Sequence, residues 1–143
     1  MGEEQKISSL TAADEQRLDA QRAVIEKYVS PAYLKAKYAT PAGKLGALRA
    51  IISANIFKAD ATYELQSVGI VFGDVFVEEM GFHWVIVEDE YGRDSAIRYK
   101  KTSILLFPLT MISKRIEKGE NVDVIDLYNG ISNKVEQLIE DGA

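Results

Sequence analysis

The most apolar stretch of the chain, residues 62–80, places the strongest constraint on the fold. Its valine and phenylalanine content, together with the Gly73-Asp74 pair, would suit a two-strand hairpin. Its length favours a helix instead, as do Thr62 at the cap position, Glu64 in the first turn and Gly81 directly after the last residue. We predict one long helix over residues 62–80, with enough apolar surface to form the centre of a core.

Two sides of this predicted helix differ in chemistry. Gly69 and Gly73 share one side, where the absence of side chains lets another backbone approach closely. A separate polar stripe carries Glu64, Ser67, Asp74 and Glu78. Asp74 and Glu78 lie one turn apart, as an acid–base pair would, but the continuation of the stripe favours a solvent-facing side. Both residues are kept as secondary candidates for a site.

Three short segments after this helix are predicted to be strands: residues 83–89, 96–99 and 103–107. Turns at Gly92 and at residues 100–101 separate them, so the segments form an antiparallel meander. The first strand is apolar on both faces, which predicts that both faces are covered. Trp84, which lies in this strand, should therefore be mostly buried.

Helical periodicity marks the remainder of the chain. Helices are predicted to begin at Thr11, at Thr40-Pro41, at Pro108 and at Asp123, each of which is a favoured residue at a helix start. The 143 residues suit one domain. The sequence thus predicts a single α+β domain over residues 11–143, with helices packed on a small three-stranded antiparallel meander, preceded by a flexible N-terminal segment over residues 1–10.

Composition excludes several classes of function. The net charge of -5 argues against nucleic acid as a partner, and the absence of cysteine excludes disulfides and thiolate chemistry. No apolar run reaches the roughly 18 residues of a membrane span, and the first residues lack the apolar core of a signal peptide. We expect a cytoplasmic protein that does not bind membranes, and no motif predicts a cofactor.

The most prominent polar group lies at the predicted tip of the first hairpin. Its candidate binding residues are Glu88, Asp89, Glu90, Tyr91, Arg93 and Arg98. In a binding site, Arg93 or Arg98 would hold an anionic group through two hydrogen bonds while Tyr91 packs against it. The alternative is a charge-compensated turn, in which the arginines pair with neighbouring carboxylates and Gly92 supplies a positive φ.

Neither a metal site nor a catalytic residue is predicted. The order of acids from Asp89 to Asp94 does not match a calcium-binding loop, and Arg93 would repel a cation. His83 is the single histidine, and in an extended strand it lies roughly 20 Å from Asp89, too far for a catalytic dyad. His83 is therefore interpreted as a residue at the end of a strand.

Three stretches carry a resemblance to a known family. They are Leu65-Gln-Ser-Val-Gly-Ile-Val-Phe-Gly-Asp74, Trp84-Val-Ile-Val-Glu-Asp-Glu-Tyr-Gly-Arg-Asp94 and Thr102-Ser-Ile-Leu-Leu-Phe-Pro-Leu-Thr-Met-Ile-Ser-Lys-Arg115. In this order they resemble the bacterial family catalogued as domain of unknown function 3806, over roughly residues 40–130. The resemblance implies no activity, so the functional interpretation depends on the residues themselves.

Two hypotheses follow for the function. The first is a non-enzymatic binding or protein-interaction module that uses the hairpin tip to hold an unknown protein or a small anionic ligand. The alternative is a carboxylate-based enzyme, similar to a hydrolase, that acts on a small anionic substrate with Asp74, Glu78, Glu88 or Asp89. An enzyme needs carboxylates that converge in a concave site, whereas a binding module needs only a shaped surface. The sequence leaves the oligomeric state open.

Overall fold

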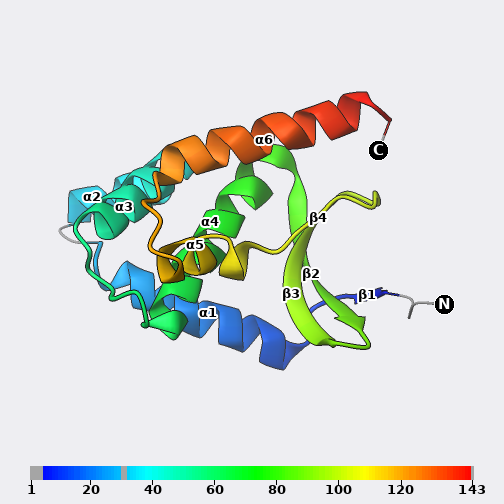
Figure 1. Cartoon of the computed structure of the whole chain (residues 1–143), viewed down its shortest axis with the longest axis horizontal. Coiled ribbons are helices and arrows are strands. Elements are labelled where there is room, and N and C mark those ends of the chain that lie inside the picture. Colours follow the sequence, from blue (N-terminus) through cyan, green and yellow to red (C-terminus); the bar gives the residue numbers. More distant parts are fainter. Residues whose placement is uncertain (1–4, 30–31, 143) are drawn as a thin grey trace.

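The computed structural model describes residues 5–29 and 32–142, and helices cover one face of an antiparallel sheet (Figure 1). The sheet has four strands in the order β1-β2-β3-β4: β1 (Lys6–Ser8), β2 (Phe82–Asp89), β3 (Gly92–Tyr99) and β4 (Leu105–Leu106). The α+β class is confirmed, but the count of three strands is wrong. The additional strand, β1, comes from the N-terminal segment that was expected to be flexible, and its Ile7 pairs with Val87 of β2.

Helix α4 lies between α1 and α6, beside the sheet (Figure 1). The helices are α1 (Ala12–Glu26), α2 (Ala32–Tyr38), α3 (Pro41–Ser53), α4 (Thr62–Met80), α5 (Ser113–Glu117) and α6 (Val124–Glu140), with a 3-10 turn, η1 (Pro108–Thr110), before α5. The side chains of Thr11, Thr40 and Asp123 each accept a backbone N–H at the start of a helix, as predicted. Pro108 starts the short η1 turn rather than a continuous helix. The sequence also predicts that Ser30-Pro31 interrupts the first helix, and these two residues lie outside the described ranges.

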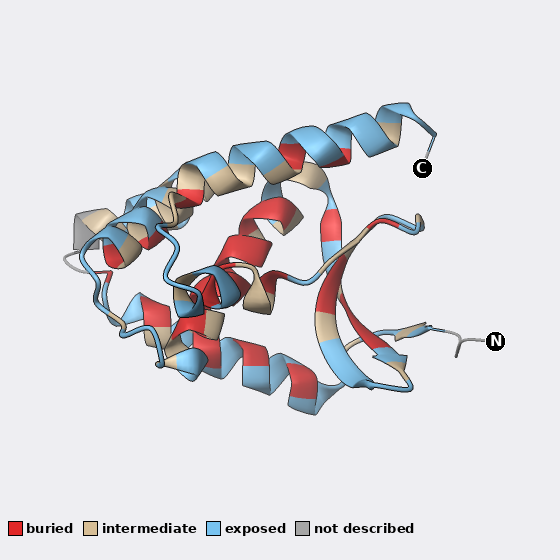
Figure 2. Ribbon diagram, viewed as in Figure 1, coloured by how far each residue is buried: buried red, intermediate tan, exposed pale blue. Residues whose placement is uncertain are grey.

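Helix α4 is the centre of the core, which confirms the predicted helix over residues 62–80 (Figure 2). Phe72 and Phe76 are fully buried and contact each other edge to face. Gly81 ends the helix with φ of 81°, a left-handed conformation that glycine adopts without strain. The expected cap at Thr62 is wrong: Ala61 occupies that position and offers no side-chain hydrogen bond.

The polar stripe of α4 faces solvent only in part, because α1 packs against Ser67 and Asp74 while Glu78 is exposed. Ser67 is fully buried, and Gln21 of α1 is nearly so. The Gln21 side-chain amide donates to the carbonyl of Tyr63 at 3.2 Å and to the hydroxyl of Ser67 at 3.3 Å. A buried polar side chain needs such partners. This part of the stripe is therefore a polar contact between α1 and α4.

The predicted close approach at Gly69 and Gly73 is confirmed. A Cβ atom on Gly69 would collide with the carbonyl oxygen of Pro108 and would lie 2.8 Å from that of Leu109. A Cβ atom on Gly73 would lie 2.7 Å from the Pro108 ring and 2.9 Å from the Trp84 indole. The η1 turn and the side chain of Trp84 therefore lie directly against the backbone of α4.

The second face of the sheet carries its own small apolar cluster. Val85, Val87 and Ala96 are buried there, and Ile7 of β1 and Leu105 of β4 pack against them. The opposite face of β2 carries Trp84, which is largely buried against α4 and confirms the expected burial. Both faces of the central strand are thus covered, one by helices and the other by side chains from the flanking strands.

The packing at Gly69 leads to a first prediction. Gly69→Ala should lower the free energy of unfolding by about 2 kcal/mol, because the added methyl group meets backbone oxygens that move only if η1 shifts. Gly46→Ala in α3 is the matched control: its Cβ has open space, and the better helix propensity of alanine should leave stability unchanged or raise it by up to about 1 kcal/mol. Urea unfolding followed by circular dichroism measures both changes, and equal effects would contradict the assignment.

Candidate functional site

The tip of the β2–β3 hairpin is a two-residue turn formed by Glu90 and Tyr91. Asp89 and Gly92 pair across it, and the Asp89 carboxylate accepts the backbone N–H of Tyr91 at 2.8 Å. The Tyr91 side chain is 90% exposed, and Glu88 and Glu90 are also exposed. Asp89 therefore shapes the turn, while the neighbouring tyrosine and glutamates extend into solvent.

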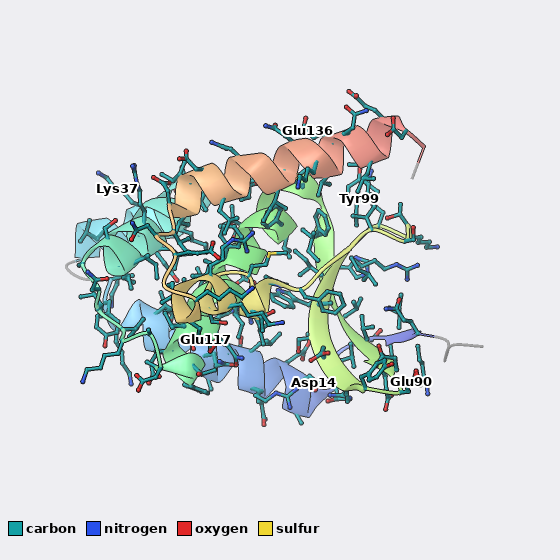
Figure 3. The ribbon with its side chains drawn as sticks, viewed as in Figure 1. Asp14, Lys37, Glu90, Tyr99, Glu117 and Glu136 are labelled. Carbon is teal, nitrogen blue, oxygen red and sulfur yellow. The ribbon has the colours of Figure 1, made fainter. Side chains whose placement is uncertain are left out.

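Arg93 binds a carboxylate of the same chain while its side chain remains 40% exposed. Its two terminal nitrogens donate to the two carboxylate oxygens of Asp14, each at 2.8 Å. Asp14 is only 1% exposed. As the third residue of α1 it also supplies the acid of the capping box, and its carboxylate accepts the Thr11 N–H at 2.8 Å. The Arg93 guanidinium and the Thr11 N–H hold the pKa of Asp14 well below its usual range. This ion pair fixes the start of α1 to the hairpin. Figure 3 shows Asp14 on α1, at the end of the sheet where the hairpin carries Glu90.

Arg98 lies on the other face of the sheet from Arg93, because alternate residues of a strand point to opposite faces and these two are an odd number of positions apart. Its guanidinium donates to the backbone carbonyl of Thr102 at 2.7 Å and to that of Lys101 at 3.4 Å. Arg98 thus closes the turn between β3 and β4. The structure does not bring the two arginines together in one binding site.

Asp74 lies at the centre of a group of polar contacts between α1, α4 and β2. The Arg22 side chain of α1 donates to both of its carboxylate oxygens, at 2.7 and 2.8 Å. The Trp84 indole N–H of β2 donates to one of them at 2.9 Å. Arg22 also binds Asp19 at 2.8 Å. The hydrogen bond from Arg22 to Asp74 raises the pKa of the Arg22 guanidinium. Arg22 thereby balances the negative charge of the Asp74 carboxylate, and the hydrogen bonds hold this side chain in place.

Glu78 belongs to a different contact. Its carboxylate accepts a hydrogen bond at 3.0 Å from Lys44 of α3, whose ammonium also donates to the backbone carbonyl of Tyr38 at 3.1 Å. Asp74 and Glu78 share a side of α4, but each has its own basic partner on a different helix. The structure therefore gives the two carboxylates separate structural contacts instead of an acid–base pair.

A shallow hollow lies beside the Arg22–Asp74–Trp84 group. It has a volume of about 610 Å³ and is lined by Ser9, Leu10, Glu15, Asp19, Arg22 and Trp84. Leu10 and Trp84 supply apolar surface, and Glu15 and Asp19 add carboxylates from α1. We call this feature the Trp84 hollow; the start of α1 that borders it is the part of the helix that Arg93 ties to the hairpin tip.

His83 lies apart from the Asp74 group. His83 is exposed and, as a neighbour of Trp84 in β2, it points to the opposite face of the sheet from Asp74. Over residues 5–29 and 32–142, no three histidine or acidic side chains gather closely enough to hold a metal ion.

The same described residues include no helix that is both long and apolar enough to span a bilayer.

The sequence identified Asp74 but not its partners. Arg22 lies on α1, 52 positions away along the chain, and nothing in its local pattern marks it. Asp14 stands three residues after Thr11, the position of the acid in a capping box, yet the second role of its carboxylate depends on Arg93, 79 positions away. A local signal existed only for Trp84, whose indole N–H needs an acceptor when the ring is buried.

The Asp14–Arg93 pair predicts a stability that depends on pH. Arg93→Ala should lower the melting temperature at neutral pH, because Asp14 then lies buried without its main partner. A carboxylate with a lowered folded-state pKa stabilises the protein above its unfolded pKa, near 4, and this contribution is lost as the pH falls toward the folded value. The difference between wild type and variant should therefore shrink below about pH 4.

Arg17→Ala is the control for this experiment. Arg17 also binds Asp14, at 2.7 Å, but through a single nitrogen and with its side chain 56% exposed. Its loss should lower the melting temperature by less than the loss of Arg93. An Arg93→Ala protein that melts like the wild type at pH 7 would show that the pair does not hold α1 to the hairpin.

The Asp74 group supplies a further prediction. Asp74→Asn should lower the free energy of unfolding by about 2 kcal/mol, since Arg22 loses its charged acceptor. The emission of Trp84, the single tryptophan of the chain, should also shift as the indole N–H changes its acceptor. Chemical unfolding and fluorescence measure the two effects. The exposed Asp126→Asn is the control, and a matching loss of stability in that variant would contradict the special role of Asp74.

The three stretches that carry the family resemblance meet at one place in the fold. Asp74 from the first binds Trp84 from the second, and Gly73 lies against both Trp84 and Pro108 from the third. The three stretches therefore form the contact at which α4 packs against β2 and η1. The residues of α1 that complete the polar contacts, Asp14 and Arg22, come from outside these stretches.

Comparison with known proteins agrees with this arrangement. A solved crystal structure of a protein from Bacteroides thetaiotaomicron VPI-5482 shares the fold with a TM-score of 0.76, at 10% sequence identity. The match covers 94% of this chain and 49% of that protein, so the chain spans about half of its length. No curated protein matches the sequence significantly. The family model described as "Domain of unknown function (DUF3806)" matches residues 44–128, which are more than half of the chain, and the chain belongs to that family.

Proposed function

We propose that this domain is a non-enzymatic protein-interaction module and that its partner presents a basic segment. The proposed binding surface combines the exposed hairpin tip, formed by Glu88, Glu90 and Tyr91, with the Trp84 hollow. Tyr91 supports the proposal most directly, because a 90% exposed aromatic side chain at a rigid turn is available for contact. Tyrosine is enriched where proteins bind one another, since it offers a large apolar ring and a polar hydroxyl.

The distribution of charge favours a basic partner over an anionic ligand. The arginines on this surface, Arg22 and Arg93, both bind carboxylates of the chain itself. By contrast, Glu15, Glu88 and Glu90 form no ion pair with any residue of the described ranges. Lys6 of β1 lies opposite Glu88 and also has no ion pair among these residues, so carboxylates outnumber free cations on this surface. This excess agrees with the overall charge of -5 and favours a basic partner.

The geometry gives less support to the enzyme alternative. An enzyme of that kind needs carboxylates that converge in a concave site. Asp74 and Glu78 have basic partners, and Asp89 accepts a backbone hydrogen bond within its turn. Glu88 and Glu90 lie at an exposed tip, where water surrounds them, so nothing around them favours proton transfer.

A fluorescence titration with a short arginine- and lysine-rich peptide tests the proposal. The peptide should change the emission of Trp84, because the single tryptophan lines the hollow. Glu88→Gln combined with Glu90→Gln should weaken binding by up to about tenfold, and Tyr91→Ala should weaken it by a similar factor. Neither variant should change the melting temperature, since the three side chains are exposed.

The control separates this surface from general attraction to an acidic protein. Glu117→Gln combined with Glu120→Gln makes the same change of charge at exposed positions on and after α5. That variant should bind the peptide like the wild type. Equal weakening by both double variants would show that only net charge matters, and the proposal would be abandoned.

A further inference from the structure

A second recess lies on another side of the molecule, between the end of α4, the end of β3 and α6. It has a volume of about 360 Å³, and the residues that line it are Glu79, Met80, Tyr99, Tyr128, Ser132, Glu136 and Ile139. None of these residues belongs to the hairpin tip or to the Trp84 hollow. Figure 3 shows Glu136 on α6 near the end of β3 that carries Tyr99, far from Glu90.

Two tyrosine rings line the recess, and the core holds both in place. The Tyr128 ring lies 4.5 Å from the ring of Phe76, between centroids, and 6.2 Å from that of Phe72. The Tyr99 ring lies 5.5 Å from that of Phe82. All three phenylalanines are buried, so the two tyrosines have little freedom to turn. The recess therefore presents aromatic surface whose position is set before any ligand arrives, which reduces the entropy lost on binding.

Two carboxylates flank these rings, Glu79 from α4 and Glu136 from α6. Burial raises the pKa of Tyr128 to about 12, and the nearby negative charges of Glu79 and Glu136 add to this effect. Both glutamates line the same recess as this phenol. Neither forms an ion pair or a side-chain hydrogen bond with the residues that the structure describes. The recess thus holds two negative charges that the described chain does not balance.

One cation of the chain contacts the Tyr99 ring from outside the recess. The ammonium of Lys100 is 5.2 Å from the centroid of the Tyr99 ring. This distance is within the range of a cation–π contact. Lys100 does not line the recess. The contact shows that the position of the Tyr99 ring is compatible with a positively charged group.

We propose that this recess receives an arginine side chain of a partner protein. A guanidinium is flat and stacks on tyrosine, and its forked N–H groups match carboxylate oxygens on either side. Glu79 and Glu136 would balance its charge, while Tyr99 and Tyr128 would cover its faces. The site lies apart from the surface proposed for a basic segment, so the two can be tested separately.

A titration followed by NMR tests the assignment with N-acetyl-arginine-N-methylamide as the probe and the isotope-labelled domain. The probe should cause saturable shifts at the backbone amides of Tyr99, Tyr128 and Glu136, with a dissociation constant of order millimolar for a single side chain. The corresponding citrulline compound has the same shape without the charge and should cause no saturable shifts there. The emission of Trp84 should remain unchanged, because this residue lines the other hollow.

Variants identify the residues responsible. Glu79→Gln and Glu136→Gln should each weaken binding of the probe by up to about fivefold, and both positions are exposed, so the fold should tolerate the change. Glu117→Gln on α5 is the control with the same change of charge and should have no effect. Tyr99→Leu should also weaken binding, because it removes one aromatic face.

Three results would overturn the proposal. One is the absence of saturable shifts at the recess with the arginine probe. Another is equal weakening by Glu117→Gln and Glu136→Gln, which would show a general charge effect. The third is a lysine probe, N-acetyl-lysine-N-methylamide, that binds as tightly as the arginine probe, because the recess would then select only charge. Loss of peptide binding at the hairpin tip has no bearing on these outcomes.

Discussion

The side of α4 that carries Gly69 and Gly73 determines how the other elements are arranged. At Gly69 the backbone of η1 lies directly against the helix, and at Gly73 the Trp84 indole and the Pro108 ring do so. These contacts place β2 on one part of α4 and the segment after β4 on another, so the sheet and the helix cannot shift independently. Close contact also explains why glycine occupies the middle of a helix, where it normally lowers stability. The three stretches that carry the family resemblance meet at this contact.

Helix α1 is held to this centre by polar contacts that span long distances in sequence. Arg93 of β3 binds Asp14, and Arg22 of α1 binds Asp74 on α4. In each pair an arginine with two parallel hydrogen bonds fixes both the position and the angle of the contact. These pairs also have a consequence for recognition. Both arginines bind carboxylates of the fold itself. Most of the exposed charged side chains near them that have no ion pair are therefore carboxylates.

Both proposed recognition surfaces follow from this pattern, although they differ in construction. The hairpin tip with the Trp84 hollow is an open surface on which one tyrosine is exposed to solvent. The recess at Tyr99 and Tyr128 is smaller, and buried phenylalanines hold its rings. A basic segment suits the first, whereas a single flat cation suits the second. A domain with two such sites could contact one partner at two points, which strengthens binding when the geometry allows both.

The sequence by itself determined the elements whose signals are local. The periodicity and flanking residues of 62–80 identified α4, and the two glycines predicted a close contact. The capping residues Thr11, Thr40 and Asp123 identified helix starts. The meander was also predicted, except for β1, since three residues at a sheet edge carry too little pattern to be recognised. The family resemblance came from stretches that lie close to one another in the fold.

Tertiary structure alone decided the roles of the charged side chains. Arg93, Arg98 and Asp74 appeared in the sequence as candidates for ligand contact, yet their partners lie on other elements or in a neighbouring turn. The sequence likewise could not show that Tyr99 and Glu136 share a recess, because β3 and α6 meet only after folding. The physical reason is range: caps and helical periods depend on residues within a few positions, whereas the environment of a charge depends on whatever the fold brings within several ångströms of it.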